Sequence, residues 1–470
     1  MDALVAMNAQ KKSNNERNTA MKSSHRRSAR RLLVVTAAVT AASLVLAACG
    51  GSDQAGSSSQ PQGSAAAVDE ALAKGGTITY WSWTPSAEAQ VKAFEKQYPN
   101  VKVNYVNAGT GNDHYTKLQN VIKAGSGAPD VAQIEYQALP QFALPGSLVD
   151  LREYGFDSLE SAYTASTWGA VHAGDGLFGL PQDSGPMALF YNKEVFDKYG
   201  LTVPKTWDEF VAAGKKLHQA DPKKYITNDT GDAGFATSMI WQAGGKPFTT
   251  DGKNVTINLA DDGTKKWTGV WNQLVTGGLV ASIPGWSDEW FKALGDGTIA
   301  TLPIGAWMPG VLESSVKAGA GKWRVAPLPT YDGQPATAEN GGSAQSVLKQ
   351  SANPALAAAF VRWLNHGEGV KPFLSSGGFP STVADLKDPA FVDKKSAYFG
   401  GQAANQVLTA AAGTVVKDWS YLPFQLYANS IFGDTVGKSY QAKTDLDPGL
   451  KAWQDALVTY GNQQGFQTNS

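Results

Sequence analysis

The segment FGLPQDSGPMALFYNKEVFDKYGLTVPKTWDEF, residues 178–210, decides the fold of this chain. After an apolar run and a polar patch, residues 187–191 predict a buried strand. A short helix follows and ends at Gly200, because glycine readily takes the left-handed backbone conformation that closes helices. Thr206 and Glu209 stand three residues apart, which is the spacing of a capping box, and they predict the start of a second helix. The segment therefore indicates a strand, a short helix and a capped helix in that order.

Strand and helix patterns alternate on the N-terminal side of this segment. Residues 77–83 and 101–106 are rich in β-branched and aromatic residues and predict two strands, with a helix between them. A second helix pattern and a third strand, at residues 129–134, come next. Parallel strands joined by helices form right-handed crossovers. The alternation therefore predicts an open α/β sheet, which binds ligands at the carboxyl ends of its strands.

Helices dominate the C-terminal side. The spacing of Trp267, Val270, Trp271 and Leu274 is that of one apolar helix face. Helices are also expected over residues 288–294, from Asn353 onward and from Asp447 onward, and a short strand is expected over residues 299–304. Tryptophans on helical stripes favour core packing, which is the interpretation for Trp267, Trp271, Trp363 and Trp453.

Composition limits the class of partner. The chain has 470 residues and 42% hydrophobic content, which is enough for two or more domains. Lys plus Arg number 40 and Asp plus Glu number 41, so the balance of charge does not favour a nucleic acid or an acidic membrane surface as partner. Charged residues are 17% of the chain, while it holds 14 Trp and 16 Tyr. This composition suits a polar but uncharged ligand.

The N-terminus has the pattern of a secretory signal. Arginines precede an apolar run over residues 32–48, and small residues then lead to Cys49. We expect residues 1–48 to be a signal peptide, with Met21 as the possible true start, and Cys49 to be the lipidation site. A transmembrane anchor with a chance cysteine is the alternative. Residues 49–74 are predicted to be a flexible, lipid-anchored linker, because they contain little to bury, and the folded body is expected from Gly75.

Catalytic motifs are missing from the sequence. The five histidines lie far apart without metal-ligand spacing, and there is no nucleophile elbow, P-loop or complete dinucleotide fingerprint. We therefore predict no catalytic residues, no metal and no cofactor. A glycoside hydrolase remains the alternative, because its two carboxylates would meet in space rather than in sequence.

The order of these motifs resembles that of a known family. The segment 178–210 is similar to the "LP...YNK..F...G...P.TWdEf" signature of extracellular solute-binding proteins that feed ATP-driven sugar importers. Residues 305–307 resemble the "G.W" of this family, residues 353–364 its "sknpeaA..F..wL", and residues 378–381 its "G.lPs". Together these fragments cover most of residues 75–470 in the family's order. The chain is similar to lipid-anchored, maltose-binding-protein-like members of Gram-positive bacteria.

The resemblance implies a two-lobed α/β fold of the type II periplasmic-binding-protein class, in which each lobe is a sheet flanked by helices. The first lobe would hold residues 75–181 and 328–370, and the second lobe residues 182–327 and 371–470. A neutral mono- or oligosaccharide would bind in the cleft between the lobes. The implied partners are the transmembrane subunits of an ABC permease and, through the lipid anchor, the extracellular face of the cell membrane. A monomer is expected, and a binder of a non-sugar solute is the second alternative.

Ten residues are candidates for contact with the ligand. Trp307 is the residue that matches the cleft tryptophan of the family. Asp183 lies beside the first crossing between the lobes, where the alternative is a hinge-turn cap. The others end strands at the carboxyl edge or lie in loops between the motifs. The full set is Trp83, Asp113, Glu135, Tyr136, Asp183, Trp241, Trp286, Trp307, Gly342 and Trp419.

Overall fold

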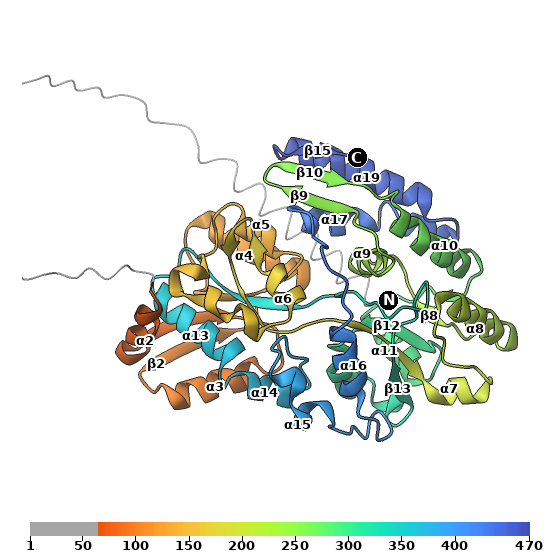
Figure 1. Ribbon diagram of the computed structural model, residues 1–470, viewed down its shortest axis with the longest axis horizontal. Helices are drawn as coiled ribbons and strands as arrows, with labels where there is room; N and C mark the ends of the chain where they lie inside the picture. The colour runs from red at the N-terminus through yellow and green to blue at the C-terminus, as the bar shows by residue number, and fades with distance from the viewer. Residues whose placement is uncertain (1–63) are drawn as a thin grey trace, which may run out of the picture. The chain divides into compact units, whose positions relative to one another are not determined.

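Figure 1 shows the computed structural model of the chain, which describes residues 64–470. The predicted signal segment, Cys49 and the first part of the predicted linker lie outside the described residues. The part described contains three clusters of buried apolar side chains. One cluster forms the core of the first lobe, and the other two lie in the second lobe. The fold is the predicted two-lobed α/β fold.

The first lobe contains a five-stranded sheet with the order β2-β1-β3-β14-β6. Its strands are β1 (Gly76–Trp81), β2 (Val101–Val106), β3 (Val131–Glu135), β6 (Leu180–Pro181) and β14 (Ser343–Val347). β1 is parallel to β2 and β3, as the alternation of patterns predicts, whereas β14 is antiparallel to β3 and to β6. β14 arrives from the second lobe and therefore completes this sheet with a segment far away in sequence.

Helices flank this sheet. They are α2 (Ala65–Lys74), α3 (Ala87–Gln97), α4 (Gly111–Ala124), α5 (Leu139–Ala143), α6 (Ala165–Ala170), α13 (Pro354–His366) and α14 (Val370–Ser375), with the 3-10 turns η1 (Leu151–Tyr154) and η2 (Phe156–Ala162). A small hairpin of β4 (His172–Ala173) and β5 (Gly176–Leu177) follows α6. Trp363 of α13 is 7% exposed and packs in this core, as its place on the helical stripe predicts.

The second lobe is built on an antiparallel sheet with the order β12-β7-β13. These strands are β7 (Met187–Asn192), β12 (Thr301–Gly305) and β13 (Trp323–Ala326). Two smaller sheets accompany it. They pair β8 (Thr227–Asn228) with β11 (Val280–Ala281), and β10 (Asn254–Ile257) with β9 (Phe248–Asp251) and β15 (Gln467–Asn469).

The helices of the second lobe come from two stretches of the chain. The first stretch gives α7 (Lys193–Lys198), α8 (Trp207–Ala220), α9 (Ala233–Gln242), α10 (Asp262–Thr276), α11 (Asp288–Gly295), α12 (Met308–Ser315) and the turn η3 (Lys317–Gly319). The second gives η4 (Asp385–Lys387), α15 (Pro389–Val392), α16 (Ala404–Ala412), α17 (Gln425–Phe432), α18 (Gly437–Ala442) and α19 (Asp447–Gln463). Trp267, Trp271 and Trp453 are fully buried here, as predicted. No helix within residues 64–470 is long and apolar enough to cross a membrane.

The signature segment folds almost as its residues predict. β7 is buried, Asn192 caps α7 through a hydrogen bond from the Val195 N–H, and Gly200 has a φ of 58°. The side chain of Thr206 accepts the N–H of Glu209 at 3.2 Å and so caps α8. The returning bond of the capping box differs by one residue, because the Glu209 carboxylate accepts the backbone N–H of Lys205 instead of that of Thr206.

The prediction of a flexible linker up to residue 74 is wrong at its end. Residues 65–74 form α2, which packs beside α13 in the first lobe (Figure 1). Val68 is completely buried in this contact, and Asp69 forms an ion pair with Arg362 at 2.6 Å. The Ser64 side chain caps the helix. The alanines favour a helix, and burial of Val68 against the first lobe stabilises it. The composition of the segment alone predicts a linker.

Candidate functional site

The candidate site is a cavity of about 460 Å³ at the carboxyl ends of three strands. β8 is parallel to β11, and a bridge between Tyr225 and Ile299 shows that the chain entering β12 is parallel to the chain entering β8. The loops after these strands carry Asp229, Trp286 and Trp307 to the wall of the cavity. This is the edge at which open α/β sheets bind ligands.

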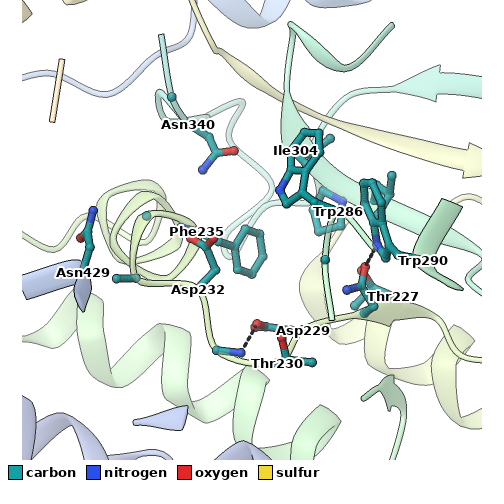
Figure 2. A pocket seen from close by; sticks show the side chains of 18 of the residues that line it. Thr227, Asp229, Thr230, Asp232, Phe235, Trp286, Trp290, Ile304, Asn340 and Asn429 are labelled. Carbon is teal, nitrogen blue, oxygen red and sulfur yellow. Dashed lines mark hydrogen bonds between the residues drawn. The ribbon is translucent and has the colours of Figure 1, made fainter. Parts of the chain in front are cut away.

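Tryptophans form one wall of the cavity (Figure 2). Trp286 stacks on Trp307, with ring centroids 5.7 Å apart and planes inclined by 26°. The Trp290 ring lies 5.4 Å from that of Trp286 and donates its indole N–H to Asn228 Oδ1 at 2.7 Å. Trp290 is 3% exposed and supports Trp286 from behind, so Trp286 and Trp307 offer the apolar surface on which a ring of a ligand can stack.

Trp286 has an unusual backbone and an exposed side chain. Its φ is 65°, in the left-handed region that costs a non-glycine residue roughly 1–2 kcal/mol. The side chain is 55% exposed, although tryptophan is among the most hydrophobic residues. Ser287 holds the turn, since its hydroxyl donates to the Pro284 carbonyl at 2.7 Å and accepts the Trp290 N–H at 3.1 Å. Strained backbone conformations are found preferentially at active and ligand-binding sites, where the surrounding structure holds them in place.

Asp229 provides a buried carboxylate to the cavity wall, below the indoles in the view of Figure 2. Its Oδ2 accepts the Trp271 indole N–H at 2.8 Å and the Tyr440 hydroxyl at 2.7 Å. Its Oδ1 accepts the Gly231 N–H at 2.9 Å. Burial raises the pKa of Asp229 to about 6, although these three donors act in the opposite direction. The carboxylate is therefore held in one orientation and keeps capacity to accept further hydrogen bonds.

The N-terminus of α9 closes the base of the cavity. The exposed side chain of Asp232 caps this helix by accepting the Phe235 N–H at 2.7 Å. Gln137 is the contribution of the first lobe to the cavity wall, and its Oε1 accepts the Asn429 amide at 3.0 Å. Because Asn429 belongs to α17, this hydrogen bond joins the two lobes beside the cavity.

The electrostatic character of the cavity is acidic and amide-rich. Within the described chain, its wall includes the carboxylates of Asp229 and Asp232 and no Lys, Arg or His side chain. The amides that line it are Gln137, Asn228, Asn340 and Asn429. No group of three or more His, Cys, Asp and Glu side chains within residues 64–470 could hold a metal ion. These groups can bind a neutral, hydroxyl-rich ligand, and they repel an anionic one.

Two of the sequence candidates, Trp286 and Trp307, line this cavity. Trp307 is half-buried and donates its indole N–H to the Asn340 carbonyl at 2.7 Å.

Glu135 lies in the first lobe at the end of β3, where it accepts the Tyr115 hydroxyl at 2.8 Å. Burial raises the pKa of Glu135, and the negative charge of Asp232 raises it further. The carboxyl groups of Glu135 in the first lobe and Asp232 in the second lobe therefore repel each other.

Trp83 and Asp113 also lie in the first lobe, outside the walls of the cavity. The Trp83 ring is half-buried with its centroid 5.0 Å from that of His114. Asp113 is exposed in the first turn of α4. Their contact with the ligand therefore stays a prediction.

Another group of candidates lies at a second cavity of about 760 Å³. Tyr136 and Trp419 line this cavity, with Tyr421 beside them. Trp241 lies behind Trp419, since the two rings stack at 4.5 Å and Trp241 is 1% exposed. The expectation of a direct ligand contact by Trp241 is therefore corrected to a supporting position under Trp419. The N-terminal end of the same helix, α9, lines the first cavity.

Asp183 and Gly342 lie at the crossings between the lobes and line neither cavity. Oδ1 of Asp183 accepts both the backbone N–H and the hydroxyl of Ser343, at 2.7 and 2.8 Å. This is the hinge-turn cap that the sequence left open as the alternative. Gly342 has a φ of 95°, and a side chain there would collide with the Tyr136 ring at 2.5 Å. Its role is thus to allow close packing.

Sequence reasoning missed Asp229, Asp232, Asn340 and Gln137. Asp229 follows the two-residue strand β8, which is too short to give a periodic pattern. Asp232 stands three residues before Phe235 at the start of α9, and this N-cap spacing was a signal that could have found it. Asn340 and Gln137 reach the cavity from segments distant in sequence, so no local pattern points to them.

The sequence profile of the bacterial extracellular solute-binding protein family matches residues 80–371. The match covers more than half of the chain, and the protein belongs to this family. Among curated relatives, the arabinooligosaccharide-binding protein of Bacillus subtilis strain 168 is 26% identical over 352 residues, which are 71% of this chain and 80% of that protein.

Solved structures with the same fold include two sugar-binding proteins of ABC transporters. The ABC transporter associated binding protein of B. animalis subsp. lactis Bl-04, in complex with β-1,6-galactobiose, is 46% identical with a TM-score of 0.78. The galacto-N-biose-/lacto-N-biose I-binding protein of Bifidobacterium longum, in complex with lacto-N-biose, is 28% identical with a TM-score of 0.74. Each alignment covers 84% of this chain and 99% of the other.

Proposed function

We propose that this protein is the sugar-binding component of an ABC importer and that its ligand is a neutral di- or short oligosaccharide. The observation that carries the proposal is the first cavity, which combines stacked indoles with carboxylates and amides and has no cationic side chain within the described chain. Its volume of about 460 Å³ is within the roughly 300–1,000 Å³ of small-molecule sites. Family membership and the sugar-binding relatives support the same function.

Each part of the cavity would recognise a different part of a sugar. The indoles of Trp286 and Trp307 would cover the apolar C–H face of a ring. Asp229, Asp232 and the amides would accept and donate hydrogen bonds to the hydroxyl groups. A missing hydroxyl would leave a buried polar group without a partner, and this cost gives the site its specificity.

A galactose-containing disaccharide is the first ligand to test. The structural relative with 46% identity was solved with β-1,6-galactobiose, and the one with 28% identity with lacto-N-biose. We propose that this chain shares a preference for β-linked galactose units. Micromolar affinity requires about −8 kcal/mol, which stacked aromatics and a few hydrogen bonds can supply.

Closure of the lobes would complete the site. The chain passes between the lobes at residues 181–187, at residues 327–343 and a third time after α14, and we propose that the first two crossings act as the hinge. In a closed state, Trp83 and Glu135 would approach the sugar from the first lobe. The ligand would favour the closed state by its differential affinity, and the permease would bind that state.

We further propose that the protein acts outside the cell as a lipid-anchored monomer without catalytic activity. The signal pattern and Cys49 in the sequence support the anchor. Two acyl chains at Cys49 would give stable membrane attachment, since a single chain binds only marginally.

Titration of the purified full chain tests this function. The chain should bind β-1,6-galactobiose or a related neutral disaccharide with one-to-one stoichiometry by calorimetry. The sugar should be intact by chromatography after long incubation. Release of monosaccharides would favour the glycoside hydrolase instead. Affinity for a charged solute that falls steeply with salt, together with no binding of sugars, would favour a non-sugar solute.

A further inference from the structure

A fully buried glutamate lies at the junction of the two lobes. Glu339 is 0% exposed and belongs to the second crossing, between β13 and β14. The two crossings run antiparallel here, with a bridge between Pro186 and Glu339. Backbone hydrogen bonds join Met187 N to Ala338 O at 3.0 Å and Asn340 N to Gly185 O at 2.8 Å. The residue is thus fixed where the chain leaves the first lobe and returns to it.

The carboxylate of Glu339 joins three separate segments. Its Oε1 accepts the hydroxyls of Ser166 at 2.8 Å and Ser184 at 3.0 Å. Its Oε2 accepts the Gly185 N–H at 2.7 Å. Ser166 belongs to α6 in the first lobe, whereas Ser184 and Gly185 belong to the first crossing. All of these partners are neutral donors, and their hydrogen bonds favour the ionised carboxylate. Burial acts in the opposite direction and raises the pKa of Glu339.

The backbone around Glu339 reaches the candidate site directly. The Glu339 carbonyl accepts the hydroxyl of Ser238, which is on α9, at 2.7 Å. The next carbonyl, of Asn340, accepts the Trp307 indole N–H at 2.7 Å. The N-terminus of α9 and Trp307 both line the first cavity. The orientation of this short segment therefore fixes two parts of the cavity wall.

We propose that Glu339 is a positioning residue that sets the angle between the lobes in the unliganded protein and, through it, the affinity for sugar. The second part rests on the proposed function. The contact with Ser166 is the only one of its side-chain contacts among residues 64–470 that reaches the body of the first lobe. Loss of this contact removes a hydrogen bond that joins α6 to the second crossing, whereas loss of the carboxylate also leaves the Gly185 N–H without its acceptor.

Two variants separate this role from that of a simple structural cap. Glu339→Gln keeps the shape but places an amide N–H₂ among donors, so one donor loses its acceptor. Ser166→Ala removes the link to the first lobe, together with a 3.3 Å contact to Thr164 within the same lobe, and leaves the crossings bonded to each other. Ser166 lines the second cavity and not the proposed sugar site. Ser158→Ala is the matched control, since Ser158 is exposed and its hydroxyl bonds only within its own turn.

The experiment measures the distance between the lobes by single-molecule fluorescence transfer. The chain has a single cysteine, Cys49, so the full chain with Cys49→Ser accepts two specific labels. Lys123→Cys on α4 and Lys266→Cys on α10 place one exposed label on each lobe. Titration with β-1,6-galactobiose is performed on the same samples.

Glu339→Gln and Ser166→Ala are expected to shift the distance distribution without sugar and to weaken sugar binding roughly 5-fold or more, while Ser158→Ala matches the parent. An unchanged unliganded distribution in Ser166→Ala overturns the proposal, as does a shifted distribution with parental affinity. Ser166→Ala decides the matter even if Glu339→Gln does not fold. If the parent binds no sugar, the proposed function fails, and the unliganded distribution still decides whether Glu339 sets the angle.

Discussion

At the scale of single residues, Trp307 connects the cavity to the crossing between the lobes. It lines the cavity and bonds the Asn340 carbonyl through its indole. Trp307→Ala is expected to weaken sugar binding by roughly 1–3 kcal/mol, because a stacked contact is lost. Its unliganded melting temperature should change little, since the half-buried ring is already partly hydrated. Calorimetric titration and melting measure both effects.

The matched control for Trp307 is Trp267. Trp267 is completely buried on α10 and does not line the cavity. Trp267→Ala should cost roughly 3–5 kcal/mol of stability through a core cavity and leave the affinity of the folded fraction unchanged. Trp271 is a poorer control than its helical pattern suggests, because its indole N–H binds Asp229 inside the site. A Trp307→Ala protein that melts early and binds normally would make the assignment to the site wrong.

The strained backbone of Trp286 allows a second test. Trp286→Gly should be more stable than Trp286→Ala by up to about 1 kcal/mol. Relief of the roughly 1–2 kcal/mol left-handed cost exceeds the roughly 0.4–1 kcal/mol of extra chain entropy that glycine loses. Both variants should lose sugar affinity equally. Denaturant unfolding measures the stability of both variants. At Phe291 in α11, where the backbone is helical, the alanine variant should instead be more stable than the glycine variant. The same order at both positions would argue against stored strain.

Asp229 predicts a pH dependence of stability. Its pKa of about 6 in the folded chain lies above the ordinary 3.8, so the folded state binds more protons between about pH 4 and pH 6. The contribution of Asp229 to the free energy of unfolding therefore falls by about 3 kcal/mol as the pH rises through this window. Asp229→Asn has no carboxyl group to titrate and therefore lacks this pH-dependent contribution. The stability difference between wild type and variant, measured by denaturant at pH 4, 5, 6 and 7, should shrink by that amount, and a constant difference would contradict the prediction.

At the scale of elements, α2 extends the folded body beyond its predicted start. Val68→Ala removes side-chain volume from a fully buried position in the contact with α13 and should cost roughly 1–3 kcal/mol of unfolding free energy. Glu70→Ala, at an exposed position of the same helix, should change stability by about 0.5 kcal/mol or less. Equal denaturation curves for the two variants would mean that residues 65–74 behave as the linker that the sequence predicts.

Strand length explains which site elements the sequence predicts. β7 and β12 have several residues each, and patterns over such lengths can be read directly. β8 and β11 have two residues each, and they become visible only through their pairing with one another. The loops that deliver Asp229 and Trp286 follow these two strands, so most of the polar wall escapes prediction.

At the scale of the whole molecule, the proposed lipid anchor at Cys49 would determine where the binding protein acts. Cys49→Ser should abolish lipidation, and the protein should then be released or retained as a precursor, because the thiol would be the acceptor of the lipid. Partition into detergent after metabolic labelling with a fatty acid measures this. Thr110→Ser, a conservative hydroxyl exchange in the folded body, serves as the control and should partition as wild type. A Cys49→Ser protein that still partitions into detergent after signal cleavage would disprove the lipid anchor.

Local patterns in the sequence determined most of the longer elements, and the order of the motifs, through its resemblance to a family, implied the two-lobed α/β fold. The strand of residues 187–191, the cap at Thr206 and the buried faces of α10, α13 and α19 depend on neighbours within a few residues, so their spacing is sufficient. Tertiary structure alone decided which tryptophans share a cavity, because their loops meet only after the strands pair. It places Trp286 and Trp307 together, puts Trp241 behind Trp419, and makes Asp183 a cap on Ser343. Burial and long-range hydrogen bonds fix these positions, and neither is encoded in the spacing of residues along the chain.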